Sequence, residues 1–180
     1  MSAATNKIIL LLGGARSGKS AYAQELAGLA GCRVLFCATA EALDGEMQSR
    51  IDKHRLSRPP NWATFEASRD IGKALGPHAS KYDAIIIDCI TILVANIMGD
   101  GTDAEKAESS VSTEILSLGE LLKRRQSNYI LVSNEAGSGI VPDNRLGRLY
   151  RDELGKANQK LAAISDEVYL LTAGIPLKLK

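Results

Sequence analysis

The chain has 180 residues, with 22 lysines and arginines, 21 aspartates and glutamates and a formal net charge of +1. This length can bury a substantial core, and we expect residues 1–180 to form a single domain. A net charge this close to zero gives no overall electrostatic footprint for nucleic acid. The three cysteines show no Cys-x-x-Cys spacing, which argues against a disulfide framework and against a zinc site. We expect them to serve as small apolar filler.

Short apolar runs alternate along the chain with segments of helical periodicity. The predicted strands are 7–12, 34–38, 84–87, 129–133 and 168–171, and the predicted helices are 19–30, 44–56, 104–125 and 145–164. Continuous apolar strands separated by helices are typical of an α/β fold, with a mostly parallel sheet flanked by helices and a ligand site at the carboxyl ends of the strands. Asp103 is a candidate cap for the third helix.

No targeting or membrane segment is predicted. The first apolar run is far shorter than the ~20 residues that a membrane span needs, and no signal-peptide cleavage pattern follows it. We therefore expect a cytoplasmic protein that does not associate with membranes.

The first predicted strand and helix are joined by a complete Gly-x-x-x-x-Gly-Lys-Ser motif. Its glycines let backbone N–H groups surround phosphates, its lysine gives positive charge to the β and γ oxygens, and its serine hydroxyl can bind Mg²⁺. A glycine-rich turn without a ligand is the alternative, but strand, loop, lysine and helix occur here in the required order. The motif predicts a P-loop NTPase that binds a nucleoside triphosphate. The loop residues are Gly13, Gly14, Ala15, Arg16, Ser17, Gly18, Lys19 and Ser20.

A carboxylate directly follows the apolar run 85–87. Phosphate-loop enzymes use an acidic residue at such a strand end to hold Mg²⁺, or its water shell, opposite the loop serine. Ser20 and Asp88 are therefore the predicted metal residues. The alternative is that Asp88 only caps the next turn.

The segment 50–66 places a histidine among cations. Repulsion from the flanking Lys53, Arg55 and Arg58 favours the neutral, nucleophilic form of His54, and the same cations would attract a triphosphate. This combination suits attack by an imidazole nitrogen on phosphorus. The alternative is a solvated helix face with an incidental histidine.

Taken together, these motifs resemble the bifunctional adenosylcobinamide kinase and adenosylcobinamide-phosphate guanylyltransferase family of cobalamin biosynthesis, over nearly the whole chain. The matching blocks are 13–20, Ala38-Thr39-Ala40, Arg50-Ile51, His54-Arg55, Arg58-Pro59, Trp62, Thr64, Glu66, Asp88-Cys89-Ile90-Thr91, Asn96, 134–142, Arg148, Arg151-Asp152, Gly155, Asn158-Gln159 and Gly174-Ile175-Pro176. The departures are mild, since Ile90 replaces a leucine and Ala136 a valine.

The resemblance implies a RecA-like P-loop fold and two reactions. ATP or GTP phosphorylates adenosylcobinamide, and GTP then transfers GMP to adenosylcobinamide phosphate through a guanylylated histidine, releasing pyrophosphate. His54 matches that histidine, and Lys19 and Mg²⁺ would serve both steps. The resemblance also implies a homo-oligomer, with trimers known. Beyond the loop, the expected nucleotide-binding residues are Arg50, Arg55, Arg58, Glu66 and Asp88.

Several assignments stay open on the sequence alone. Arg16 and the arginines of segment 50–66 could clamp phosphates or be surface charges. Trp62 and Phe65 are more typical of a core than of a platform for a ring. The polar, glycine-rich stretch 134–139 could contact substrate or merely connect two elements. A small-molecule kinase without guanylyl transfer, or a RecA-like ATPase that binds nucleic acid or protein, are the alternative functions.

Overall fold

The computed structural model describes residues 6–41, 45–56, 58–99 and 103–180, without the side chains of Glu46, Met47, Arg50, Lys53 and His54. Within these ranges the strands form one sheet in the order β3-β2-β4-β5-β1-β6-β7, parallel except for the β6–β7 pair. The strands are β1 Ile8–Gly13, β2 Val34–Ala38, β3 Ala63–Glu66, β4 Ala84–Asp88, β5 Asn128–Val132, β6 Glu167–Thr172 and β7 Ile175–Lys178.

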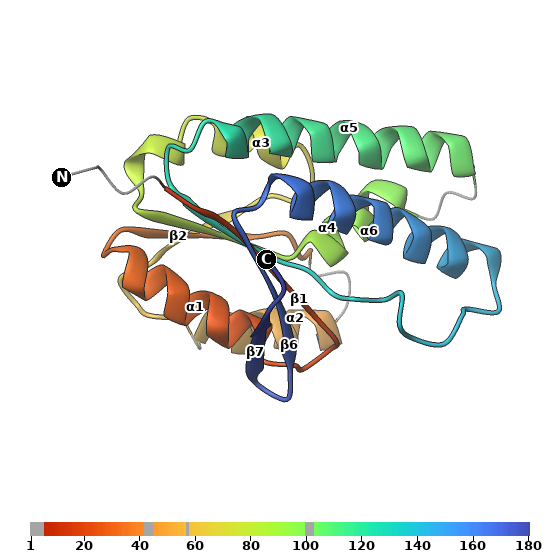
Figure 1. Ribbon diagram of the computed structural model, residues 1–180, viewed down its shortest axis with the longest axis horizontal. Helices are drawn as coiled ribbons and strands as arrows, with labels where there is room; N and C mark the ends of the chain where they lie inside the picture. Colours follow the sequence, from red (N-terminus) through yellow and green to blue (C-terminus); the bar gives the residue numbers. More distant parts are fainter. Residues whose placement is uncertain (1–5, 42–44, 57, 100–102) are drawn as a thin grey trace.

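Helices cover both faces of this sheet, and Figure 1 shows α1 and α2 on one side of it and α3 to α6 on the other. The helices are α1 Lys19–Ala30, α2 Gly45–Leu56, α3 Ile71–Leu75, α4 Ile90–Met98, α5 Ala104–Lys123 and α6 Arg145–Ile164, with a short 3₁₀ turn at Ala79–Lys81. The predicted α/β architecture is confirmed.

The continuous apolar strands are explained by two separate cores. In β4, Ile85 and Ile87 pack into the core beneath α3 to α6, while Ala84 and Ile86 pack into the core beneath α1. Because both faces of a central parallel strand are buried, no polar residue interrupts the run until its last position, Asp88.

The long helices follow the sequence pattern closely. The predicted helices 19–30 and 145–164 and the strand 34–38 are confirmed at both ends. Asp103 caps α5 as expected, because its carboxylate accepts a hydrogen bond from the Lys106 N–H at 3.2 Å. Helix α5 ends two residues before the predicted end, and β5 begins one residue earlier than predicted. Asp44, the predicted first residue of the second helix, lies outside the described residues.

The sequence pattern did not reveal β3, α3, α4 or β7. Three of these elements have only four or five residues, too few to show a period. Helix α4 is apolar along most of its length and follows an apolar strand. The sequence pattern therefore did not distinguish the residues of this helix from those of the strand before it.

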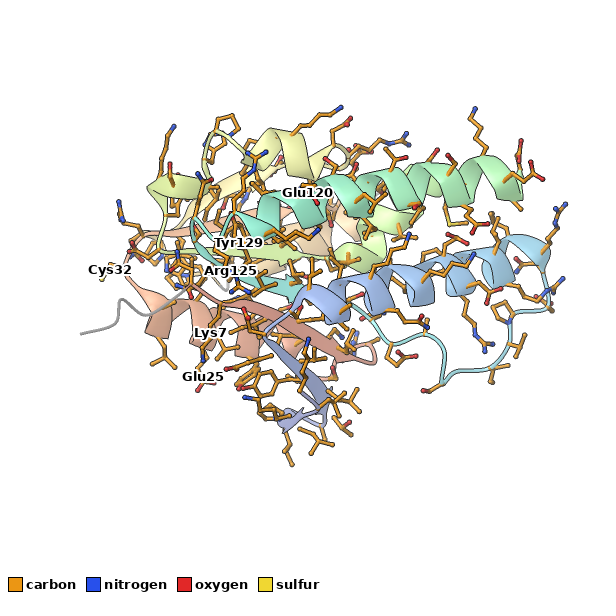
Figure 2. All side chains as sticks on the ribbon, turned by 45° about the horizontal axis from the view of Figure 1, so that its top comes forward. Lys7, Glu25, Cys32, Glu120, Arg125 and Tyr129 are labelled. Atoms are coloured by element: carbon orange, nitrogen blue, oxygen red, sulfur yellow. The ribbon has the colours of Figure 1, made fainter. Side chains whose placement is uncertain are left out.

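The cysteines only partly meet the expectation of apolar filler. Cys37 is buried and Cys89 is half-buried, but Cys32 is exposed beside the start of β2, on the surface seen in Figure 2. In the described part of the chain, none of the helices has the length and apolar character that a membrane crossing requires.

Candidate functional site

The predicted phosphate loop joins β1 to α1. Two of its glycines have a positive φ and lie too close to neighbouring backbone for a side chain. Gly13 has a φ of +150°, and a Cβ there would lie 2.5 Å from the Leu171 carbonyl oxygen. Gly18 has a φ of +96°, and its Cβ would lie 3.0 Å from the Cα of Gly174. The turn between β6 and β7 is also bonded to the loop, because the Gly174 N–H donates to the Ser17 carbonyl at 3.0 Å. By contrast, a Cβ at Gly14 would meet no atom within 4 Å.

Lys19 is buried at the base of the loop and bonded to its backbone. Its Nζ donates to the carbonyl oxygens of Gly13 and Gly14, at 3.0 and 2.6 Å. Burial lowers the pKa of Lys19 from its usual value, while the nearby Cys89 and Asp88 oppose this shift. The loop therefore holds a partly desolvated positive charge whose hydrogen bonds go to neutral groups, two carbonyls and the Ser17 hydroxyl.

The side chains of Ser20 and Asp88 meet although β1, which leads into the phosphate loop, and β4, which ends at Asp88, are not neighbours in the sheet. Strand β5 lies between β1 and β4, but α1 packs across β5 and β4 and carries Ser20 over to the end of β4. The Ser20 hydroxyl donates to Asp88 Oδ2 at 2.8 Å. Two hard oxygen donors side by side at a phosphate loop suit Mg²⁺, which takes few protein ligands and completes its shell with phosphate and water. Among the described residues, here or elsewhere, no group of three or more His, Cys, Asp or Glu side chains could hold a metal ion.

A cavity of about 470 Å³ opens beside these groups, at the carboxyl ends of β2, β4 and β5. Its walls combine the loop with one cation, one carboxylate and an apolar side. The lining residues are Ala15, Arg16, Ser17, Gly18, Lys19, Ser20, Ala21, Phe36, Ala38, Ala40, Ile51, Arg58, Asp88, Cys89, Ile92, Val132 and Asn134.

Arg58 is held at the wall of this cavity by uncharged partners. Its guanidinium carbon lies 3.6 Å from the centre of the Phe36 ring, and its Nη1 donates to Thr64 Oγ1 at 3.3 Å. Among the described residues, no group accepts a hydrogen bond from its buried Nε. Burial lowers the pKa of Arg58, an effect that the charge of Asp88 opposes. Phe36 carries no sequence signal, since it is one apolar residue in an apolar strand.

Arg55 and Glu66, also predicted to bind nucleotide, lie in a second cavity rather than in the first. This cavity has a volume of about 550 Å³ and shares Ala40 and Ile51 with the first one. Arg55 forms an exposed ion pair with Glu66 at its wall. Helix α2 carries Ile51 and Arg55, and also Arg50 and His54, whose side chains are outside the described part of the structure.

Buried and half-buried polar side chains hold the strand ends around the first cavity. The Thr91 hydroxyl accepts a hydrogen bond from the Asn134 N–H at 2.7 Å, and the buried Asn158 donates to the Asn134 carbonyl at 3.0 Å. The Thr39 hydroxyl likewise bonds to the backbone of Cys89, directly after β4. Sequence reasoning left Asn158 unassigned and gave Thr39 no role. For Thr39 the available signal was its place directly after a buried strand, whereas Asn158 lies within α6 and has no such signal.

The remaining aromatic candidates belong to the core. Trp62 and Phe65 are half-buried and pack against the two apolar clusters, one on each, as expected. His78 packs on the ring of Phe65, with ring centroids 5.1 Å apart, and it lines neither cavity.

Comparison with known proteins gives a consistent result. The family described as cobinamide kinase / cobinamide phosphate guanyltransferase matches residues 9–179. The protein from Salmonella typhimurium named bifunctional adenosylcobalamin biosynthesis protein CobU is 42% identical over 96% of this chain and 99% of its own. The Escherichia coli protein of the same name is 38% identical over the same shares. The Pseudomonas aeruginosa protein named CobP is 40% identical over 95% and 96%.

Proposed function

We propose, from the premise that this chain belongs to the cobinamide kinase / cobinamide phosphate guanyltransferase family, that a single nucleotide site serves both of its reactions. The chain is a bifunctional transferase of adenosylcobalamin biosynthesis that acts as cobinamide kinase and cobinamide phosphate guanylyltransferase. The observation that carries the proposal is the Ser20–Asp88 hydrogen bond, which lies beside Lys19 in the cavity of about 470 Å³. The cavity therefore offers a lysine to the phosphates of a triphosphate and two oxygen donors to its metal ion.

In the kinase reaction, the loop backbone and Lys19 hold the β and γ phosphates of ATP or GTP. Arg58 adds a guanidinium from the opposite wall of the cavity. Ser20 and Asp88 would hold Mg²⁺, which would neutralise negative charge on the phosphates when bound. The aminopropanol hydroxyl of adenosylcobinamide attacks the γ phosphorus, and the nucleoside diphosphate leaves. This reaction needs positioning and charge neutralisation but no protein nucleophile.

In the transferase reaction, a nitrogen of His54 attacks the α phosphorus of GTP and pyrophosphate leaves. A phosphate oxygen of adenosylcobinamide phosphate then displaces His54 from the P–N bond, giving adenosylcobinamide-GDP and free imidazole. Support comes from helix α2, because Ile51, three residues before His54, lines both cavities. We assign Arg16, Arg50 and Arg55 to phosphate contacts and Glu66 to the part of the same nucleotide that would extend into the adjoining second cavity.

The test is covalent labelling with GTP that is radioactive at the α phosphate. The wild-type protein should acquire an acid-labile, base-stable label, and His54→Ala and His54→Asn should abolish both labelling and GMP transfer. Phosphorylation of adenosylcobinamide should persist at least in part in both variants. His78→Ala is the matched control and should label normally.

Three outcomes would contradict this mechanism. A GMP adduct mapped by mass spectrometry to His78 or to a lysine would move the nucleophile elsewhere. A wild-type protein that takes no label would be a kinase without guanylyl transfer. Hydrolysis that nucleic acid stimulates would instead favour the RecA-like ATPase.

We further propose a homo-oligomer that works in the cytoplasm on small molecules rather than nucleic acid. Strand β7 is a sheet edge whose Ile175 and Leu177, with Leu179 just after it, are 57–70% exposed, and such an edge suits pairing with a second copy. Light scattering should give a mass of several chains, and Leu177→Lys should reduce it. A monomeric wild-type protein would contradict the proposal. The cytoplasm is where nucleoside triphosphates are available, and the net charge of +1 gives no overall electrostatic attraction for nucleic acid.

A further inference from the structure

Thr39 is a fully buried polar residue directly after β2, beside the end of β4. The two strands pair in register so that Ala38 lies opposite Asp88. One residue further on, the Thr39 hydroxyl donates to the Cys89 carbonyl at 2.8 Å and accepts from the Cys89 N–H at 2.8 Å. The backbone N–H of Thr39 also donates to the Asp88 carbonyl at 3.1 Å. One residue thus makes three hydrogen bonds to the backbone of Asp88 and Cys89.

These hydrogen bonds connect the strand end to a helix that is itself held in place. The Cys89 carbonyl also accepts the Leu93 N–H at 3.1 Å, at the start of α4. Asn96, two turns into α4, returns a hydrogen bond from its side-chain amide to the Thr39 carbonyl at 2.8 Å. Thr39 is therefore fixed by the same helix that its hydroxyl helps to place.

We propose that Thr39 is a positioning residue whose hydroxyl fixes the backbone after β4, so that the Asp88 carboxylate meets Ser20 in the geometry that the metal needs. The inference rests on the proposed role of Asp88 as a metal residue. An aspartate side chain is short, so its carboxylate is placed only as well as its backbone. Mg²⁺ demands near-ideal octahedral geometry, and a small displacement of one ligand weakens its binding. Groups that orient metal ligands commonly change metal affinity by about 10- to 100-fold when they are removed.

A purely structural role for Thr39 makes a different prediction. Burying a hydroxyl is unfavourable unless its hydrogen bonds are made, and losing them destabilises the fold wherever the residue lies. Ser127 offers the matched comparison, because its hydroxyl is also buried and bonds to the carbonyls of Ala79 and Tyr82, before β4. Removing either hydroxyl should lower stability, but only Thr39 should change the metal site.

The experiment measures Mn²⁺ binding by electron paramagnetic resonance, in the presence of a non-hydrolysable GTP analogue, together with kinase kinetics. Thr39→Val keeps the shape but loses the hydroxyl, and it should weaken Mn²⁺ binding about 10-fold. Its kcat should fall at limiting Mg²⁺ and recover in part as Mg²⁺ rises, with the KM for GTP nearly unchanged. Thr39→Ser keeps both hydroxyl bonds and should bind Mn²⁺ within about threefold of wild type. Ser127→Ala should lower the unfolding temperature and leave Mn²⁺ binding unchanged.

The inference is overturned if folded Thr39→Val binds Mn²⁺ like wild type, or if Ser127→Ala weakens Mn²⁺ binding equally. If Thr39→Val does not fold, Thr39→Ser decides alone, and a loss of more than about threefold in Mn²⁺ affinity overturns it. Asp88→Asn separates this inference from the proposed function. Unchanged Mn²⁺ affinity in Asp88→Asn removes the metal role of Asp88 itself, whereas weakened binding there with normal binding in Thr39→Val removes only the role of Thr39.

Discussion

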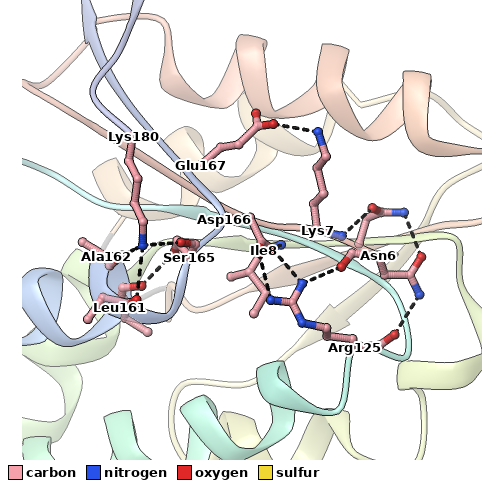
Figure 3. A network of polar contacts seen from close by, with 12 residues as sticks. Asn6, Lys7, Ile8, Arg125, Leu161, Ala162, Ser165, Asp166, Glu167 and Lys180 are labelled. Carbon is pink, nitrogen blue, oxygen red and sulfur yellow. Dashed lines mark hydrogen bonds and ion pairs between the residues drawn. The ribbon is translucent and has the colours of Figure 1, made fainter. Parts of the chain in front are cut away.

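Charge is used in opposite ways where the parallel strands begin and in the first cavity, at their other end. At the end where the parallel strands begin, the Arg125 guanidinium makes two 2.8 Å hydrogen bonds to the Asp166 carboxylate, which also accepts the Ile8 N–H (Figure 3). In the first cavity, the hydrogen bonds of Lys19 go to loop carbonyls and to the Ser17 hydroxyl, and Arg58 lies on an aromatic ring. The first arrangement uses charge to hold the fold together. The second keeps positive charge on neutral supports, where an anionic ligand can use it.

This difference has an energetic basis. A cation bonded by a carboxylate of its own chain would lose that partner before it could bind phosphate, whereas carbonyls and rings place a cation without neutralising it. The energetic cost of this arrangement is the burial of two charged groups, and this burial lowers the pKa of both Lys19 and Arg58. Substitutions at the two ends should therefore separate catalysis from stability, and four experiments test this, from the largest expected effect to the smallest.

Lys19→Ala should lower the rates of both reactions by about 100-fold or more, because the loss removes one preorganised charge from both transition states. The free energy of unfolding should change by less than about 1 kcal/mol, since Lys19 bonds only to its own loop. Initial rates with each acceptor and urea unfolding provide the measurement. Wild-type activity in either reaction would mean that the two reactions use separate nucleotide sites.

Arg58→Met should reduce kcat/KM for GTP by about 10- to 100-fold, as expected when a charged hydrogen bond worth about 1.5–3 kcal/mol is lost. Methionine keeps the contact with the Phe36 ring. Arg55→Met is the comparison and should have a smaller effect, because the phosphate contact that we assign to Arg55 would be made by an exposed side chain already paired with Glu66, and surface pairs contribute about 0–1 kcal/mol. A larger effect at Arg55 than at Arg58 would mean that the second cavity holds the phosphates.

Asp166→Asn should reduce the free energy of unfolding by about 1–2 kcal/mol at pH 7 without changing kinetic constants. Hydrogen bonds from Arg125 lower the pKa of Asp166, so its folded pKa lies below its unfolded pKa of about 3.9. The stabilisation is then fully present above the unfolded pKa and is lost as pH falls through the folded pKa. Urea unfolding from pH 7 downwards should show a constant difference between wild type and variant above the unfolded pKa of about 3.9, and convergence below it. The exposed Asp152→Asn should show no such convergence.

Thiol labelling should show the smallest but most local effect. Cys32 is exposed and should react first, whereas burial raises the pKa of Cys89 to about 11 and that of Cys37 to about 12. Because Cys89 lines the first cavity, a GTP analogue should slow its labelling by iodoacetamide and leave Cys32 unaffected. Equal protection of both thiols would mean that nucleotide tightens the whole fold rather than covering this cavity.

The parts that sequence predicted are those where one local pattern suffices. Helix α6 has a clear apolar period and an Asn144 cap, and α1 begins within the phosphate loop, which is a contiguous motif. Asp88 could be predicted as a strand end, but its contact with Ser20 depends on α1 crossing two strands, which no local pattern encodes. The stacking of Arg58 on Phe36 and the second cavity likewise join segments whose pairing only the folded sheet decides.

The contact between the phosphate loop and the β6–β7 turn has a consequence for the order in which the site matures during synthesis. The loop motif is translated early, but β1 pairs with β5 and β6, and the walls that confine Gly13 and Gly18 come from Leu171 and Gly174. A nascent chain carries the complete nucleotide motif long before the backbone that encloses it leaves the ribosome. Nucleotide capture by this protein is therefore a late event, which reports that the sheet has closed around its first strand.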